Sequence, residues 1–380
     1  MNVGQGTERG GGMRKRRLVA LAAGIAVVAG LVGVSLATAS SSSPKLTKVT
    51  LQSKWVVQSQ FAGYYVAKAK GYYRQAGLDV TIKPGGPDIS PEQVVLAGQA
   101  DFGIDWMPSL LSFRDKGQDL VNIAQVFARS GTTEVTFKSS GINTFKKMRG
   151  KKFGVWILGN EFEQEAALVK NGMDPHKDVK LVKQNFDVVP FLKHEIDATS
   201  AMTYNELAQI LEAKNPKTGK LYTLKDLNVF KMSDLGTGML QDGVFVKGSY
   251  LKDAAHRATA VKFLVASFKG WIYCRNHVAA CTNIVVSQGT ALPRGHQTWQ
   301  MNEINKLIWP NTKGIGVMDP AAFATTAKIS QTYKIIKKAP SGAYVTTYAK
   351  QAVANLKKQG VDVNGKTYKP IVVKLKPGGK

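Results

Sequence analysis

Cysteine is nearly absent from this chain, since only Cys274 and Cys281 occur among 380 residues. A pair of thiols in an exported protein is usually a disulfide. On one unbroken helix, a separation of seven residues would place the two Cα atoms roughly 10 Å apart, which is too far to bridge. A Cys274–Cys281 disulfide therefore predicts a helix break between Arg275 and His277. With His277 the two thiols would supply only three ligands, so we expect no metal site.

A long apolar run occurs once, from Leu18 to Ala37, directly after the basic residues 14–17. The run ends in Ala37-Thr38-Ala39, so residues 1–39 have the order of a secretory signal that is cleaved after Ala39. An uncleaved anchor stays open, because about 20 apolar residues can span a bilayer. No cysteine follows the run, which disfavours a lipid-anchored protein. Both alternatives predict export, to the periplasm or the extracellular face of the cytoplasmic membrane, with residues 40–48 as a linker.

Acidic residues are few, 26 against 52 basic ones, and the formal net charge is +26. The lysines are scattered as KAK, KGK, KK and KTYK instead of forming one basic arm or a motif interleaved with aromatics. This pattern excludes a typical nucleic-acid partner. For an exported protein we expect electrostatic contact with anionic membrane lipid or wall polymers. The alternative that the chain is an exported polyanion-binding protein stays open, and so does the reason for the strong charge.

Motifs of catalysis are also missing. The sequence has no nucleophile elbow, no glycine-rich phosphate loop and no paired His/carboxylate metal motif. Most of its five histidines fall on expected helices or loops among charged neighbours: His176, His194, His256, His277 and His296. We therefore expect neither an enzyme nor a bound cofactor.

What is present is a regular alternation of short apolar runs and helical segments. Gly77 follows one helical segment as a stop signal, and Ser90-Pro91 starts another with a capping serine and a proline at its first position. Strands that alternate with helices in this way predict a parallel sheet covered on both faces. The expected strands of the first unit are 49–57, 78–82, 101–104 and 120–127, and its helices are 61–76, 91–98 and 108–116.

The alternation then starts again and gives a second α/β unit. Its expected strands are 152–156, 179–183 and 198–203, and its helices are 161–171, 188–194 and 204–213. After residue 253 the pattern is helical, with segments 254–274, 277–286, 296–308, 320–336 and 344–358. Two such units followed by helices predict two lobes with a cleft between them.

Aromatic, amide and acidic residues gather where the expected strands end. In open parallel sheets, ligands bind beyond the carboxyl ends of the strands. Indole and phenol faces stack on flat rings, and Asn, Asp and Glu bind their polar edges. Such a set predicts a site for a planar nitrogen heterocycle. The candidate ligand-binding residues are Trp55, Tyr64, Asp105, Trp106, Trp156, Asn160, Glu161, Tyr204, Asn205, Glu206 and Asp234. The role of Trp156 as a core residue, and of Glu161 as a helix-start carboxylate, stays open.

The runs "FAGYYVAKAKGYYRQAGLDVTI" and "VVLAGQADFGID" resemble the substrate-binding proteins of ABC importers, in the group for thiamine pyrimidine precursors and for nitrate, sulfonate and taurine. The resemblance covers roughly residues 49–290. The phrases "GKKFGVWILGNEFE" and "AMTYNELAQILEA" are similar to the branch that carries hydroxymethylpyrimidine-type precursors and riboflavin.

This resemblance implies an α/β, two-lobed type II periplasmic binding protein fold, with a helical C-terminal region whose role is open. We expect lobe 1 at 49–135, lobe 2 at 136–238, a return to lobe 1 at 239–340, and a C-terminal helix and basic tail at 341–380. The implied protein is a monomer that captures a small-molecule ligand and delivers it to an ABC permease and ATPase. Of the candidate residues, the resemblance supports Trp55, Tyr64, Trp106, Asn160, Glu161, Tyr204 and Glu206.

Two alternatives remain within this family. A receptor for sulfonate, taurine or nitrate would want cationic donors, and Lys54 is the only obvious cation at the strand ends. The family also includes fungal enzymes that build the thiamine pyrimidine with a cysteine-rich iron motif. This sequence departs from them because it has no cysteine cluster.

Overall fold

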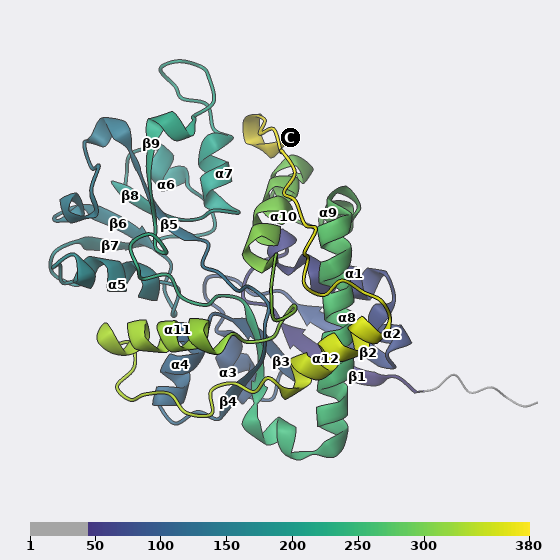
Figure 1. Ribbon diagram of the computed structural model, residues 1–380. Coiled ribbons are helices and arrows are strands. Elements are labelled where there is room, and N and C mark those ends of the chain that lie inside the picture. Colours follow the sequence, from purple (N-terminus) through teal and green to yellow (C-terminus); the bar gives the residue numbers. More distant parts are fainter. Residues whose placement is uncertain (1–44) are drawn as a thin grey trace, which may run out of the picture. The chain divides into compact units, whose positions relative to one another are not determined.

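The computed structural model describes residues 45–380, which form one compact unit with two five-stranded sheets (Figure 1). The expected signal or anchor at 1–39 and most of the expected linker at 40–48 lie outside the described residues. Within residues 45–380, no helix combines the length and the apolar character that a membrane crossing needs.

The first sheet has the strand order β2-β1-β3-β10-β4. Its strands are β1 (Thr47–Gln52), β2 (Leu78–Lys83), β3 (Phe102–Asp105), β4 (Leu120–Gln125) and β10 (Gly243–Lys247). Strands β1, β2 and β3 are parallel, but β10 runs antiparallel to both β3 and β4. The prediction of a purely parallel sheet is therefore wrong. Strand β10 begins 118 residues after the end of β4, and the apolar run that forms it was not recognised as a strand.

The second sheet has the order β7-β6-β8-β5-β9. Its strands are β5 (Thr132–Phe137), β6 (Lys152–Val155), β7 (Lys180–Lys183), β8 (Ala198–Met202) and β9 (Leu227–Lys231). Strands β6, β7 and β8 are parallel, and β5 is antiparallel to both β8 and β9. The chain thus passes between the sheets twice, through residues 126–131 and 232–242.

Helices cover the faces of both sheets (Figure 1). In the first unit they are α1 (Ala62–Ala69), α2 (Tyr72–Gln75), α3 (Pro91–Leu96) and α4 (Met107–Asp115); in the second they are α5 (Phe162–Lys170), α6 (Val189–Leu192) and α7 (Glu206–Leu211). The predicted cap of α3 is confirmed, since the Ser90 side chain accepts a bond from the backbone N–H of Gln93. The single helix predicted at 61–76 is wrong, because Gly71 takes a φ of 71° and separates α1 from α2.

The chain after β10 is helical, with α8 (Ala254–Asn276), α9 (Val278–Val286), α10 (Arg294–Ile308), α11 (Pro320–Thr332) and α12 (Thr347–Lys358). Cys274 and Cys281 form a disulfide with their Cα atoms 5.0 Å apart. His277, with φ −137° and ψ 58°, separates α8 from α9. The predicted helix break is confirmed, and it is what brings the two cysteines within bonding distance.

Glycines allow α1 and α8 to lie in close contact. A Cβ on Gly63 would come within 2.3 Å of the Trp271 ring, and a Cβ on Gly270 within 1.9 Å of the Gly63 carbonyl oxygen. Such distances are far shorter than van der Waals contact. Each of these two positions therefore requires glycine, which has no side chain. The glycine of the "AGYYVA" phrase therefore serves the packing of α1 against α8.

Candidate functional site

A cavity lies beyond the ends of β1, β3, β6 and β8, where side chains of both sheets meet. Its volume is about 20 Å³, roughly the room of one water molecule. Its walls are mainly aromatic and amide side chains together with one lysine and one glutamate. The lining residues are Lys54, Trp55, Gln58, Gln60, Trp106, Trp156, Asn160, Met202, Tyr204, Asn205 and Glu206.

Four of the cavity walls are aromatic. Trp55, after β1, meets Trp156, after β6, edge to face with ring centroids 6.3 Å apart and an interplanar angle of 71°. Trp106 follows β3, and Tyr204 follows β8. The indole N–H of Trp156 donates to the carbonyl oxygen of Asn185 at 2.7 Å, which fixes the orientation of this ring. Flat surfaces from both sheets thus face one space, an arrangement suited to a flat ligand.

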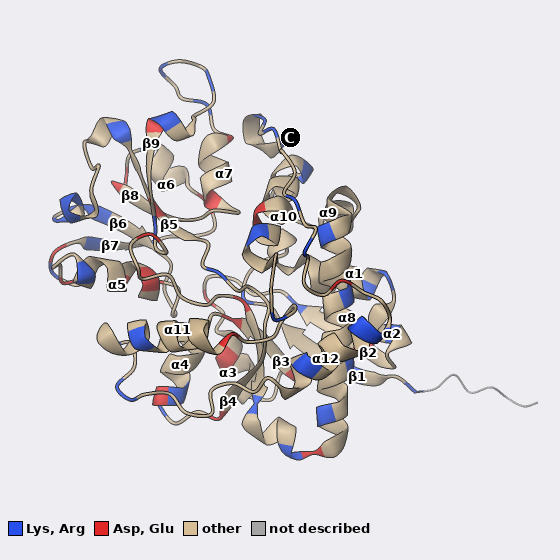
Figure 2. Ribbon diagram, viewed as in Figure 1, with Lys and Arg blue, Asp and Glu red and all other residues tan. Residues whose placement is uncertain are grey.

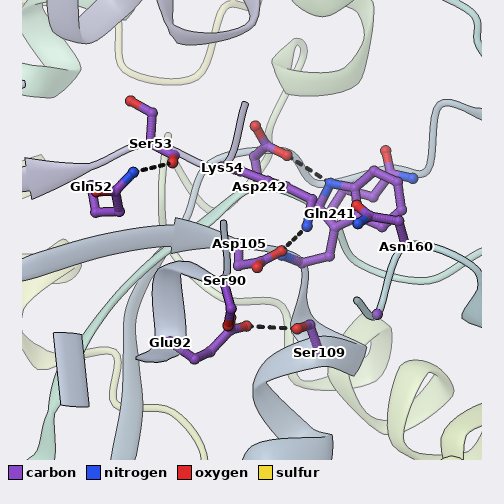
Figure 3. Close-up of polar contacts among 12 residues, drawn as sticks. Gln52, Ser53, Lys54, Ser90, Glu92, Asp105, Ser109, Asn160, Gln241 and Asp242 are labelled. Atoms are coloured by element: carbon purple, nitrogen blue, oxygen red, sulfur yellow. Dashed lines mark hydrogen bonds and ion pairs between the residues drawn. The ribbon is translucent and has the colours of Figure 1, made fainter. Parts of the chain in front are cut away.

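The cation of the cavity is neutralised by an adjacent acid. Lys54 forms a buried ion pair with Asp105 (Figure 3), and its Nζ lies 4.7 Å from the centroid of the Trp106 ring. Asp105 also accepts the backbone N–H of Trp106 at 2.6 Å. Because one carboxylate already balances the ammonium group, the cavity carries little free positive charge for an anionic ligand.

A second acid lies behind the aromatic wall. Asp242 accepts the indole N–H of Trp106 at 2.8 Å and the amide of Gln60 at 2.9 Å. Burial raises the pKa of this carboxyl group to about 6, although the bonds from Gln60, the charge of Lys54 and the bond from Trp106 oppose the shift. Asp242 lies in the second passage between the sheets, so it ties that passage to the cavity wall.

Helix α10 supports the cavity through a chain of amides. Gln300 donates to Gln58 at 3.1 Å, and Gln58 donates to Gln60 at 2.6 Å. Gln297 and Gln300 also accept the backbone N–H of Ser59 at 2.7 and 2.8 Å. The segment after β1 is therefore held by a helix that follows it by more than 230 residues, which gives part of the C-terminal helical region a positioning role.

Glu206 is the acid that lines the cavity itself. Its two carboxyl oxygens accept the backbone N–H of Met202 at 3.0 Å and the amide of Asn205 at 2.7 Å. Burial raises the pKa of Glu206 to about 8 in spite of these two bonds. At neutral pH the protonated form therefore dominates, and it can donate a hydrogen bond as well as accept one.

Asn205 is itself held by a buried histidine. His296 on α10 lies 2.9 Å from Asn205 Oδ1 through Nε2 and 2.9 Å from Glu212 Oε2 through Nδ1. Since Asn205 Oδ1 can only accept, Nε2 of His296 carries a proton and donates. The side-chain amide of Asn205 is then directed toward Glu206, and α7 is linked to α10.

A fourth buried acid lies at the start of α3, beside the ion pair. Glu92 accepts the hydroxyl of Ser109 at 2.6 Å and that of Ser90 at 2.9 Å (Figure 3). Burial and the charge of Asp105 raise the pKa of Glu92 to about 8. The polar set behind the cavity thus contains more carboxyl groups than cations.

The structure brings most of the predicted site residues to this cavity. Those that line it are Trp55, Trp106, Trp156, Asn160, Tyr204, Asn205 and Glu206. Asp105 lies behind the wall as the partner of Lys54. Glu161 faces an adjacent groove with Glu165 and accepts the backbone N–H of Gly159 at 2.9 Å. Tyr333, which also lines that groove, follows the last residue of α11.

Tyr64 and Asp234, which the sequence placed at the ligand site, do not line the cavity. The Tyr64 ring is 1% exposed and stacks on Phe263 with centroids 6.4 Å apart. It faces α8 because α1 packs its inner side against that helix. Asp234 is exposed in the turn after β9, where its backbone N–H bonds Lys231.

Four lining residues were not among the candidate ligand-binding residues: Lys54, noted only as a cation at the strand ends, and Gln58, Gln60 and Met202. Gln58 and Gln60 follow the end of β1 in the stretch "VVQSQ", so a count of amides after that strand would have found them. Met202 ends β8, and its apolar side chain gives no sequence signal of its own. Among residues 45–380, no group of three or more His, Cys, Asp or Glu is placed to hold a metal ion.

Solved structures share this architecture. The periplasmic aliphatic sulphonate binding protein of Escherichia coli matches with a TM-score of 0.56 at 14% sequence identity, over 88% of this chain and 95% of that chain. At such an identity the likeness shows the fold alone. The chain has the periplasmic binding protein fold, and the predicted fold class is confirmed.

The family follows from the sequence itself. Residues 58–280 match the family described as NMT1/THI5 like. Because the match spans more than half of the chain, this protein belongs to the NMT1/THI5-like family, and the predicted family resemblance is confirmed.

Curated relatives of this family carry different names. A Bacillus subtilis protein named a binding protein is 27% identical over 241 residues, which is 62% of this chain and 68% of the relative. The 4-amino-5-hydroxymethyl-2-methylpyrimidine phosphate synthase of Schizosaccharomyces pombe is 25% identical over 153 residues, which is 40% of this chain and 43% of the relative. The chain spans about half the length of the first curated relatives that it matches.

Proposed function

We propose that this protein is the exported, extracytoplasmic ligand-binding component of an ABC importer, and that it captures a small, uncharged nitrogen heterocycle of the thiamine-pyrimidine-precursor type. One observation carries the proposal. The cavity joins four aromatic walls to Asn160, Asn205 and Glu206, and its single lysine is paired with Asp105. A flat ring with donors and acceptors on its edge fits these walls better than a small anion does.

Charge separates this ligand class from the sulfonates. An anionic ligand needs cationic or N–H donors that are not already neutralised. Around this cavity, among residues 45–380, Lys54 is the lining cation, and it faces Asp105. Asp242, whose pKa of about 6 leaves it mostly ionised at pH 7, adds a negative charge behind the wall. A neutral or weakly basic ring avoids this repulsion, whereas a sulfonate or nitrate meets it.

The cavity is nearly closed in this structure. Its volume of about 20 Å³ is far below the about 300–1,000 Å³ of pockets that enclose small molecules. A pyrimidine ring or riboflavin therefore enters only when the cavity opens. Entry requires the two sheets' walls to separate, and residues 126–131 and 232–242, which connect the sheets, are where we expect that motion to occur.

A binding role also fits the polar groups better than catalysis does. The name of the fission yeast relative as a pyrimidine phosphate synthase supports the pyrimidine as ligand. In this chain the buried groups at the cavity each bond to a neighbouring protein group: Asp105 to Lys54, Asp242 to Trp106 and Gln60, and Glu206 to Asn205. Such groups orient a ligand and penalise analogues that lack matching donors, by about 1–3 kcal/mol for each group left unpaired.

Isothermal titration with hydroxymethylpyrimidine, its formylamino precursor, riboflavin and taurine tests the proposal. We expect a pyrimidine to bind and taurine to give no heat. Trp156→Ala should weaken pyrimidine binding about tenfold or more, since aromatic contact is worth about 0.5–1.5 kcal/mol beyond area burial.

Tyr204→Phe is a finer probe with a matched control. It removes a hydroxyl at the cavity wall and should weaken binding by about fivefold, corresponding to about 1 kcal/mol for one hydrogen bond. Tyr222→Phe removes the same group from a tyrosine buried in the core of the second sheet, outside the cavity, and should bind as the parent does. Tight taurine binding with no response to any heterocycle would contradict the proposal and favour a sulfonate receptor.

A further inference from the structure

The C-terminal part of the chain is far more basic than the rest. Residues 333–380 contain eleven lysines and one acid, Asp362. Asp362 lies 3.5 Å from Arg275, so its charge is already paired. The lysines that follow it are exposed: Lys366, Lys369, Lys374, Lys376 and Lys380. No carboxylate side chain of residues 363–380 offsets these charges.

Burial makes the remaining surface more basic than the net charge indicates. Seven acidic side chains of the described residues are buried, namely Glu92, Asp105, Glu134, Glu163, Glu206, Glu212 and Asp242, whereas Lys54 is the buried basic one. The acids are thus drawn inward, and lysine and arginine dominate the ribbon's outer segments (Figure 2).

Exposed apolar side chains stand between the C-terminal lysines. In the stretch "KPIVVKLK", Ile371 is 46% exposed and Val372 is 99% exposed. They lie between Lys369 on one side and Lys374 on the other. The fold leaves the valine fully in water and the isoleucine half in water. Their apolar surface is removed from water only by contact with another apolar phase.

The segment is attached to the fold at Ile371, Leu375 and Gly378 and is not a free tail. The backbone N–H of Ile371 donates to Asn302 Oδ1 on α10 at 2.9 Å. Leu375 packs against the core of the second sheet, and the backbone N–H of Gly378 donates to the Glu212 carbonyl at 3.0 Å. Figure 1 shows this part of the trace running beside α10 to α7. The apolar pair is therefore held in place at the surface.

We propose that residues 366–376, which we term the basic strap, dock this protein onto an anionic lipid surface. The exposed lysines contact lipid phosphates, and Ile371 and Val372 enter the headgroup region between them. A basic segment with exposed apolar groups gains from both interactions at one interface. The strap bonds α10 through Asn302, and none of its residues lines the ligand cavity, so the inference does not depend on which ligand is bound.

The apolar pair favours lipid over a soluble polyanion. A wall polymer offers charge but no apolar phase, and would use the lysines alone. A bilayer uses lysines and apolar side chains together. The two partners therefore predict different effects of substitutions at Ile371 and Val372.

Flotation or sedimentation of the full chain with vesicles tests the proposal. We expect binding to vesicles of phosphatidylglycerol and phosphatidylcholine in equal parts, and weak binding to phosphatidylcholine alone. The variant Lys369→Gln/Lys374→Gln/Lys376→Gln should lose at least tenfold in partition, since each lysine near an anionic surface contributes about fivefold. The variant Ile371→Ser/Val372→Ser should lose about threefold or more, with unchanged thermal stability because these side chains are exposed.

The control is Lys138→Gln/Lys146→Gln/Lys180→Gln, which removes the same charge from exposed positions around the second sheet. All variants share residues 1–44, so any contribution of that segment is the same in each. Equal losses in the strap and control variants would overturn the proposal, because binding would then follow total charge. So would unchanged binding of the Ile371→Ser/Val372→Ser variant, which would indicate a polyanion partner. Neither result bears on the ligand titrations.

Discussion

The raised pKa of Glu206 makes a direct prediction about stability. An acid with a raised folded-state pKa binds its proton more tightly in the folded protein than in the unfolded chain. Glu206 moves from an ordinary value of 4.5 to about 8. Its contribution to the free energy of unfolding is therefore largest at low pH and is lost as pH rises from about 4.5 to about 8.

The magnitude follows from the linkage relation. One group that is protonated in the folded state and ionised in the unfolded state lowers the free energy of unfolding by about 1.4 kcal/mol per pH unit. From pH 5 to pH 8 the loss is therefore at most about 4 kcal/mol for Glu206. Glu163, whose pKa burial raises to about 7, and Asp242, raised to about 6, add to the slope over lower ranges.

Glu206→Gln isolates the contribution of one group. Glutamine cannot titrate, so its variant should show a shallower fall in stability between pH 5 and pH 8 than the parent. It should also be less stable at pH 5 by about 1–3 kcal/mol, because one carboxyl oxygen that accepts from Met202 or Asn205 becomes a donor. This second loss does not depend on pH, so the slope and the offset can be separated.

Urea unfolding at pH 5, 6, 7 and 8 gives the required free energies. The exposed Glu195 provides the control, and Glu195→Gln should retain the parent slope. If the parent and Glu206→Gln have the same slope over this range, Glu206 is ionised in the folded protein, and the reasoning on its burial is wrong.

Three further predictions concern stability and the cavity wall. Replacing Cys274 and Cys281 by alanine should lower the free energy of unfolding by about 2–3 kcal/mol, as a short closed loop predicts, measured against the oxidised parent. Gly270→Ala should lower the free energy of unfolding by about 1–3 kcal/mol, or prevent folding through overpacking, because its Cβ would lie 1.9 Å from a backbone oxygen. Gly289→Ala is the control. Nothing lies within 4 Å of a Cβ there, so this variant reports only the strain of its positive φ. Trp106→Phe should cost about 1–3 kcal/mol by removing a donor from buried Asp242; a calorimetric midpoint equal to the parent's would show that water replaces this bond.

Local patterns predicted much of this fold because they report local physics. Ser90-Pro91 marked the start of α3, and alternating apolar runs located most strands, since capping and burial periodicity act over a few residues. The two cysteines, seven residues apart, required the break at His277 because helix rise fixes the distance between them. Aromatic and amide residues after β1, β3, β6 and β8 also predicted where the cavity walls lie.

Other features depend on long-range contacts that no local pattern contains. Strand β10 joins the first sheet antiparallel from a distant part of the chain, so its register could not be read from its own residues. Tyr64 faces the core because Gly63 allows α8 to approach. Whether the Tyr64 ring faces the core or a ligand depends on how the distant helix α8 packs against α1, and no local pattern specifies that packing.

The sequence by itself determined the family, most of the strands and helices, the helix break at the disulfide and the residue types at the strand ends, because each depends on neighbours along the chain. Tertiary structure alone decided that Asp105 neutralises Lys54, that Gln297, Gln300 and His296 of α10 support the cavity, and that burial keeps Glu206 protonated. These properties arise from charges and donors brought together across more than fifty residues, where only the folded chain sets the distances and excludes water.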